Sequence, residues 1–169
     1  HNPDEKGYND PAVWDAMSEL KVAGFTDRLG IAPGPANGFT LDLIYSFEQF
    51  GELMDWAMII LNPLEPWPGR LCLKAAENAG IDILTRVVDY GGIFHGTMKP
   101  DHEFRAGDHR TYRPSGWVEE GLRRVDNMRS IIDKYDLSER HFSCLWNLSH
   151  APVRSVVPTF IQEAGDDAK

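Results

Sequence analysis

Apolar residues follow two alternating patterns along this chain, helical spacing in some segments and short continuous runs in others. Helical spacing predicts helices over 11–23, 40–50, 70–79, 117–135 and 138–148. Asp10 and Pro11 suit the start of the first helix and Gly24 suits its end, while Ser138 suits the cap of the last. The spacing places the following residues on the apolar faces of the first two helices: Val13, Trp14, Met17, Leu20 and Val22; Leu41, Ile44, Tyr45 and Phe47.

The continuous apolar runs predict four buried strands, over 28–32, 56–61, 81–88 and 153–157. A run such as 56–61, which does not alternate with polar residues, is typical of a parallel strand covered on both faces. Strands separated by helices imply parallel pairing with right-handed crossovers. The fold class is therefore α/β, either a doubly wound sheet or half of a (β/α)8 TIM barrel. No Gly-x-Gly-x-x-Gly follows a strand, and this absence favours the barrel.

The two ends of the sequence suggest a part of a larger fold. The first residue is His1, no strand precedes it, and a closing helix is expected from Ile161 onward. We expect residues 1–169 to form one domain without an internal boundary. The longest irregular stretch, 89–116, has the length of a lid or binding segment.

Composition excludes some classes of function. The formal net charge of −9, without a long basic cluster, argues against nucleic-acid binding. No apolar run has the length of a membrane span. Cys72 and Cys144 are isolated within helical patterns, so buried reduced thiols are expected, as in a cytoplasmic protein.

Candidate chemistry lies where the predicted strands end, because ligands of both α/β architectures bind at the carboxyl ends of the strands. His1 could donate to a carbonyl oxygen or accept from a hydroxyl near neutral pH. The turn over 89–92 could bring backbone amides close to a phosphate, although paired glycines mostly serve tight turns.

The long irregular stretch carries further titratable residues. Its histidines and acids match no familiar ligand spacing, so no metal is expected. Arg105, Arg110 and Arg113 could bind an anion or neutralise the neighbouring acids, and the second interpretation is favoured. No Ser stands in the context of an activated nucleophile.

Several short motifs, in order along the chain, resemble the second half of the aldo/keto reductases. They are His1-Asn2-Pro3-Asp4, Leu20-Lys21-Val22-Ala23-Gly24, Arg28-Leu29-Gly30-Ile31, Gly92-Ile93-Phe94-His95-Gly96, Phe104 with Gly107-Asp108-His109-Arg110, and Leu148 to Pro158. The resemblance implies a barrel segment from the end of the fourth strand to just beyond the eighth. It also implies metal-free reduction of aldehydes or ketones with NADP or NAD as cofactor. His1 corresponds to the family's catalytic histidine, and the catalytic Asp, Tyr and Lys would lie upstream.

The resemblance also assigns cofactor-binding positions: Ala32, Asn62, Val88, Asp89, Tyr90, Gly92, Pro158 and Thr159. Several of them depart from the family pattern. Ala32-Pro33 replaces Ser-Asn, Leu61 or Asn62 replaces Gln, Leu64 replaces an aromatic ring, and Thr159 replaces Gly. Pro33 has no N–H to donate, and Asp89 would face phosphate unfavourably.

The leading hypothesis is NAD(P)H-dependent reduction of an aldehyde or ketone, with sugar-derived carbonyls among the candidates. The alternative is a redox-inactive partner subunit or a carbohydrate-converting barrel enzyme. The expected partners are a small carbonyl substrate and the missing N-terminal half of the barrel, with a homo-oligomer as a further option. Alone, the chain should be inactive, and it should either aggregate or dimerise along its open strand edges.

Overall fold

A computed structural model describes residue 3 and residues 5–34 and 39–159 of the chain. His1 and the helix expected from Ile161 lie outside the described residues. The elements, in chain order, are α1 (Glu5–Asn9), α2 (Pro11–Val22), β1 (Gly30–Ile31), α3 (Thr40–Phe50), β2 (Trp56–Ile60), α4 (Leu71–Ala79), β3 (Asp82–Arg86), α5 (Trp117–Asp126), α6 (Arg129–Lys134), α7 (Glu139–Leu148) and β4 (Val153–Val157).

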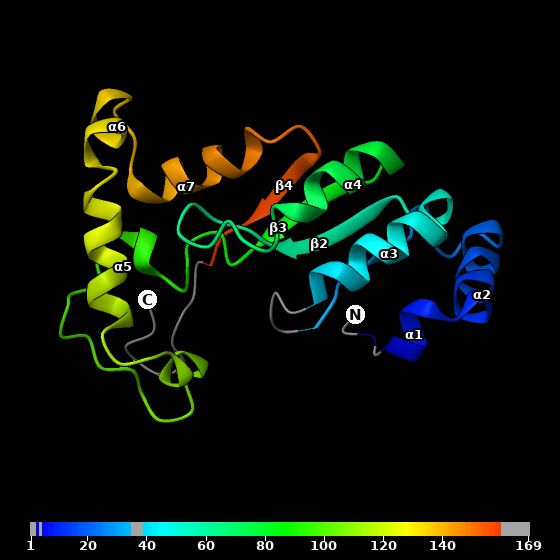
Figure 1. Ribbon diagram of the computed structural model, residues 1–169, viewed down its shortest axis with the longest axis horizontal. Helices are drawn as coiled ribbons and strands as arrows, with labels where there is room; N and C mark the ends of the chain where they lie inside the picture. The colour runs from blue at the N-terminus through cyan, green and yellow to red at the C-terminus, as the bar shows by residue number, and fades with distance from the viewer. Residues whose placement is uncertain (1–2, 4, 35–38, 160–169) are drawn as a thin grey trace.

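The strands form one parallel sheet in the order β1-β2-β3-β4. Helices α3, α4 and α7 connect successive strands and lie along one side of them, with α1 and α2 at one end of the molecule and α5 and α6 at the other (Figure 1). This alternation of strand and helix confirms the predicted α/β fold with parallel strands. The sheet is open, with β1 and β4 as its edge strands.

The two faces of the sheet differ in burial. Ala57 and Ile83, which are paired in register, face the helices and are 1% and 0% exposed. Met58 and Leu84 form the next pair and lie on the opposite face, where both are half-buried. We call this second side the open face. The prediction that 56–61 is covered on both faces is therefore wrong for Trp56 and Met58, which are half-buried, whereas Ile60 near the end of the strand is buried on this face.

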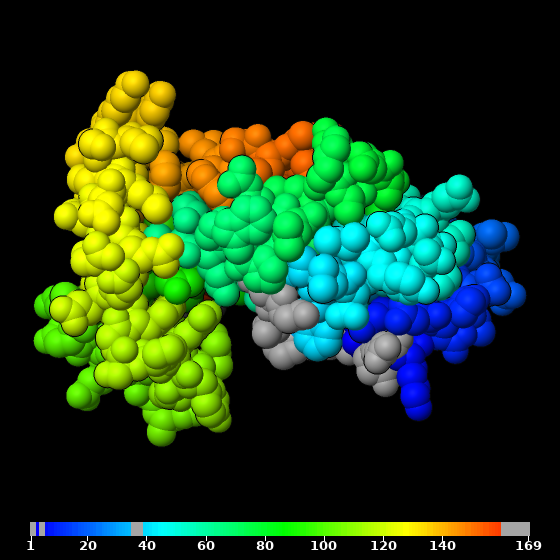
Figure 2. All heavy atoms as spheres, viewed as in Figure 1, coloured from blue at the N-terminus to red at the C-terminus, as the bar shows by residue number. Residues whose placement is uncertain are grey.

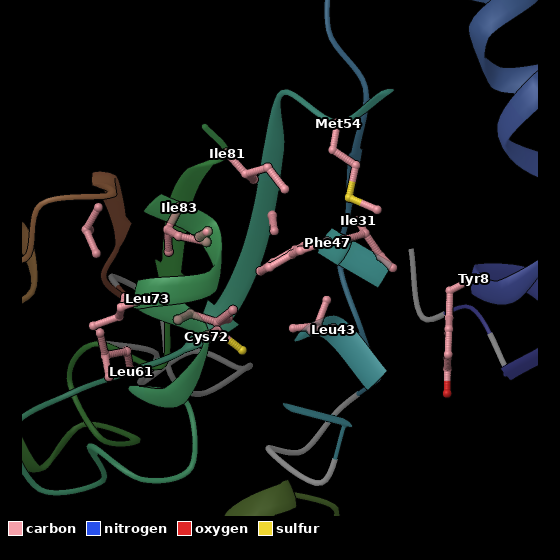
Figure 3. Close-up of a cluster of buried hydrophobic side chains, with 14 of the residues drawn as sticks. Tyr8, Ile31, Leu43, Phe47, Met54, Leu61, Cys72, Leu73, Ile81 and Ile83 are labelled. Carbon is pink, nitrogen blue, oxygen red and sulfur yellow. The ribbon is translucent and has the colours of Figure 1, made fainter. Parts of the chain in front are cut away.

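The main core lies between the sheet and helices α3 and α4. Leu43 and Phe47 of α3 pack with Ile31, Ile83 and the fully buried Cys72 (Figure 3). Burial raises the pKa of the Cys72 thiol to about 12. Cys72 and Cys144 are both free thiols, as expected, although Cys144 is only partly buried.

A second, smaller core lies beneath the long connection between β3 and β4. It contains the following buried residues: Leu64, Tyr90, Ile93, Phe94, Val118, Val125 and Ile132. A Cβ on Gly121 of α5 would lie 3.2 Å from the Ile93 side chain, so α5 packs closely against the segment that follows β3. The irregular stretch therefore has a hydrophobic core of its own.

The helices of the structure differ from the predicted ones at several points. The single helix expected over 117–135 is two helices, α5 and α6, because the chain turns at Asn127 and Met128. The short helix α1 was not predicted. The apolar face assigned to α2 is only partly correct: Trp14 is buried and Met17 packs against the core, but Leu20 is 50% and Val22 89% exposed.

The apolar face assigned to α3 also differs from the structure. Leu43 and Phe47 are its buried apolar residues, whereas Leu41 is 73% and Tyr45 49% exposed. The helix contacts the sheet through a narrow stripe, so the apolar residues beside that stripe remain in solvent. Among the helices of the described ranges, none combines the length and the apolar composition needed to cross a bilayer.

Candidate functional site

The carboxyl ends of all four strands lie at the same edge of the sheet, because the strands are parallel. Residues 32–34, 61–62, 87–92 and 158–159 follow the strands at this edge, which we call the carboxyl edge. Figure 2 shows the lobe of residues 97–120 (yellow-green) projecting from the molecule. The carboxyl edge therefore brings together all the described residues that the sequence assigned to a cofactor. His1, the assigned catalytic residue, lies outside the described residues.

Asn62 connects the turn after β2 to the turn after β3. The fully buried amide donates from Nδ2 to the Val87 carbonyl at 3.0 Å, and Oδ1 accepts from the backbone N–H groups of Leu64 at 3.0 Å and Glu65 at 2.8 Å. A cofactor contact through Oδ1 would therefore compete with two internal hydrogen bonds.

The segment after β3 leaves the sheet through a strained backbone. Val87 has a φ of 55° and Tyr90 a φ of 50°, both in the left-handed region that β-branched and bulky residues avoid. Val88 between them is fully buried, and its carbonyl accepts a hydrogen bond from the Ser143 hydroxyl of α7. Side chains from neighbouring elements therefore hold this turn in place.

Asp89 is turned into the protein and is 1% exposed. Its Oδ2 lies 2.8 Å from Nε2 of His95 and accepts from the Thr159 backbone N–H at 3.3 Å. The Thr159 hydroxyl lies 3.5 Å from Oδ1. The carboxylate thus joins the segments after β3 and β4.

The glycine turn over 90–92 is also internally bonded. The backbone N–H of Tyr90 donates to the Val87 carbonyl at 3.0 Å, and that of Gly92 to the Asp89 carbonyl at 3.1 Å. Because these two backbone N–H groups already donate within the turn, fewer N–H donors remain in it to bind a phosphate. A Cβ on Gly91 would lie 3.1 Å from the Trp117 ring.

Arg110 anchors the long loop to this turn. Its guanidinium is 4% exposed, pairs with Asp108 at 2.5 Å, and donates from Nη1 to the Gly91 carbonyl at 3.2 Å. The hydrogen bond from Arg110 lowers the pKa of Asp108 to about 2. For Arg110, this geometry confirms the interpretation that the loop arginines neutralise adjacent acids. Arg113 instead stacks on the rings of Tyr90 and Trp117.

The chain after β1 forms the remaining part of the edge. Ala32 is partly exposed, whereas Pro33 and Gly34 are buried. Their carbonyls accept from Nη2 of Arg86, at 3.5 Å for Pro33 and 2.7 Å for Gly34. Burial lowers the pKa of Arg86 from its ordinary value.

Sequence reasoning missed two side chains at this edge, Arg86 and the His95 partner of Asp89. A charged residue at the end of an otherwise apolar strand was a signal for the first. An Asp and a His on either side of a glycine turn were a signal for the second. Within 5–34 and 39–159, no group of three or more His, Cys, Asp or Glu side chains could hold a metal ion.

Comparison with known proteins supports the barrel architecture. The chain is similar to the structure of the glycerol dehydrogenase AKR11B4 from Gluconobacter oxydans, with a TM-score of 0.75 and 22% sequence identity. The match covers 92% of this chain and 46% of that one, so the chain spans about half the length of this structural neighbour. No family model and no curated protein matches the sequence. The fold is therefore that of part of a (β/α)8 barrel, as predicted, with its sheet open.

Proposed function

We propose that this chain supplies the carboxyl-terminal half of a barrel that reduces aldehydes or ketones with NADPH or NADH. The observation that carries the proposal is the similarity over 92% of the chain to a structure whose name is that of a glycerol dehydrogenase. The motif order in the sequence independently supports a likeness to aldo/keto reductases. In such a barrel, ligands bind at the carboxyl ends of the strands.

The resemblance to aldo/keto reductases assigns the proposed roles. His1 would orient the substrate carbonyl, and the following residues would line the cofactor site: Ala32, Asn62, Val88, Asp89, Tyr90, Gly92, Pro158 and Thr159. The nicotinamide group would supply hydride. Of the described polar groups, Asn62 and Asp89 would shape the site through internal hydrogen bonds rather than through direct contact.

The cofactor fits the described residues only in part. Pro33 offers no N–H, the Asn62 oxygen already accepts two hydrogen bonds, and two amides of the glycine turn donate within it. These observations favour the second candidate, a barrel without redox activity or one that converts carbohydrates.

A binding experiment separates the two candidates. The complete polypeptide that carries this chain is titrated with NADPH and with NADH, and nucleotide fluorescence is followed. The reductase proposal expects saturable quenching or enhancement by at least one of the two nucleotides. Failure of both to bind would contradict it and favour the second candidate.

A further inference from the structure

Arg86 lies at the carboxyl edge and has no counter-ion among the residues that the structure describes. Arg86 is the last residue of β3, and its register partners are Ile60 of β2 and Val157 of β4. Alternate residues of a strand point to the same face. Arg86 follows Leu84 by two residues in β3 and therefore lies on the open face. A positive charge thus lies between two aliphatic neighbours at the place where ligands of this fold bind.

Within the described residues, the hydrogen bonds of Arg86 involve only one of its three guanidinium nitrogens, Nη2. Nη2 donates to the carbonyls of Pro33 and Gly34, and within the described residues Nε and Nη1 have no acceptor. No carboxylate of those residues pairs with it, although the chain carries a net charge of −9. The deeply buried Arg110, by contrast, has its carboxylate partner in Asp108.

Burial without a counter-ion is unfavourable for a cation. The lowered pKa of Arg86 has burial as its cause, without a compensating acid. Asp89, three residues further along the chain, is turned toward His95 and Thr159 instead. An anion that approached the edge would therefore supply the negative charge that the described part of the chain does not provide.

We propose that Arg86 binds an oxyanion group, a carboxylate or a phosphate, of the ligand that occupies the carboxyl edge. The Pro33 and Gly34 carbonyls hold one arm of the planar guanidinium, and the remaining N–H groups are free to form a charge-assisted fork with two oxygens. This inference deepens the proposed function, on which it rests for the identity of the site. Its test does not require turnover or an intact nicotinamide site.

The test measures binding of small anions to the complete polypeptide that carries this chain. Inorganic pyrophosphate represents the diphosphate of a dinucleotide, and propionate represents a carboxylate substrate. Binding is measured by calorimetry for the wild type, Arg86→Met, Arg86→Lys and the control Arg154→Met. Arg154 suits the control because it is an arginine of β4 that is already paired with Asp82, with its Nε 3.2 Å from Oδ1.

We expect Arg86→Met to weaken anion binding by about 10- to 100-fold, the usual effect of losing a charge-assisted pair. Arg154→Met should leave the affinity within about twofold of the wild type, since its guanidinium lies near the opposite end of the sheet. Arg86→Lys should restore part of the affinity, because a lysine keeps the charge but loses the fork. A larger effect on pyrophosphate would identify the cofactor as the source of the anion, and a larger effect on propionate would identify the substrate.

A second measurement does not depend on the variants being folded. In the wild-type chain, the Nε–Hε resonance of Arg86 should shift as pyrophosphate or propionate is added. An unchanged resonance, or equal losses of affinity in Arg86→Met and Arg154→Met, would overturn the proposal. The role of Arg86 would then be limited to holding the segment after β1 in place through the Pro33 and Gly34 carbonyls. That result would leave the nucleotide titration untouched, so the two proposals can fail separately.

Discussion

Single polar side chains hold the carboxyl edge in its unusual backbone conformation. Val87 has a positive φ that costs a β-branched residue about 1–3 kcal/mol, and such strain persists only where the surroundings enforce it. Asn62 is the nearest such constraint, since its amide donates to the Val87 carbonyl. Sequence reasoning placed Asn62 at a strand end but could not foresee that its amide faces inward, because this depends on the turn after the neighbouring strand.

Replacing Asn62 by Ala tests this role. The change removes three buried hydrogen bonds of the side chain and leaves the Leu64 N–H without its Oδ1 partner, whereas the Val87 carbonyl still accepts from Tyr90 and the Glu65 N–H still donates to the backbone carbonyl of residue 62. We expect the free energy of unfolding to fall by about 1–3 kcal/mol, as measured by urea denaturation. Asn78→Ala on the exposed side of α4 is the control and should change it by less than about 0.5 kcal/mol. Equal, small effects of both variants would show that Asn62 does not hold the turn.

At the scale of elements, local signals in the sequence predicted helix ends better than helix faces. The helix expected over 40–50 is α3 with the same bounds, and Asp10 and Ser138 cap their helices through side-chain hydrogen bonds. Caps and glycine stops act within a few residues, so a sequence reveals them. The buried face of α2 and the break between α5 and α6 depend on what packs against each helix, which the local pattern does not contain.

A buried ion pair helps to fix the long loop between β3 and β4. Asp108 and Arg110 fix the loop, and Arg110 also holds the Gly91 carbonyl of the glycine turn. Asp108→Asn removes the carboxylate charge beside a guanidinium that is 4% exposed, and we expect the free energy of unfolding to fall by about 3 kcal/mol at pH 7. The exposed Asp101→Asn is the control and should have little effect.

The pH dependence of stability supplies a second readout for this pair. The pKa of Asp108 is about 2 in the folded chain, against an ordinary value of 3.8. Because the folded pKa is the lower one, the pair stabilises the fold above pH 3.8, and this contribution is lost as the pH falls toward 2. The difference in melting temperature between wild type and Asp108→Asn should therefore shrink over that interval. A difference that stays constant from pH 5 to pH 2 would contradict an ionised Asp108 as its source.

At the scale of the whole molecule, the parallel pairing of the strands was the most predictable feature. Strands alternating with helices imply a parallel sheet, and the observed sequence order of the strands agrees with the barrel rather than with the doubly wound alternative. The internal bonding of the carboxyl edge was not predictable, because it joins residues far apart in sequence, such as Asp89 with Thr159 and Arg86 with Gly34. Position along a strand indicates where a site lies, and long-range contacts decide which groups remain available in it.

The open face leads to a prediction about association. Met58 and Leu84 adjoin a shallow apolar hollow of about 290 Å³, lined also by Ala32 and Trp56, and β1 and β4 are edge strands of the sheet. Exposed apolar surface and strand edges favour pairing with another chain or with further strands of a barrel. We therefore expect the 169-residue chain to self-associate at micromolar concentration in sedimentation velocity experiments.

Two variants test whether the open face causes this association. Leu84→Lys should shift the distribution toward monomer, because association would bury the introduced charge, whereas Leu145→Lys on the exposed surface of α7 should not. A monomeric wild-type chain with a sharp, cooperative thermal transition would show that the open face is stable in water without a partner.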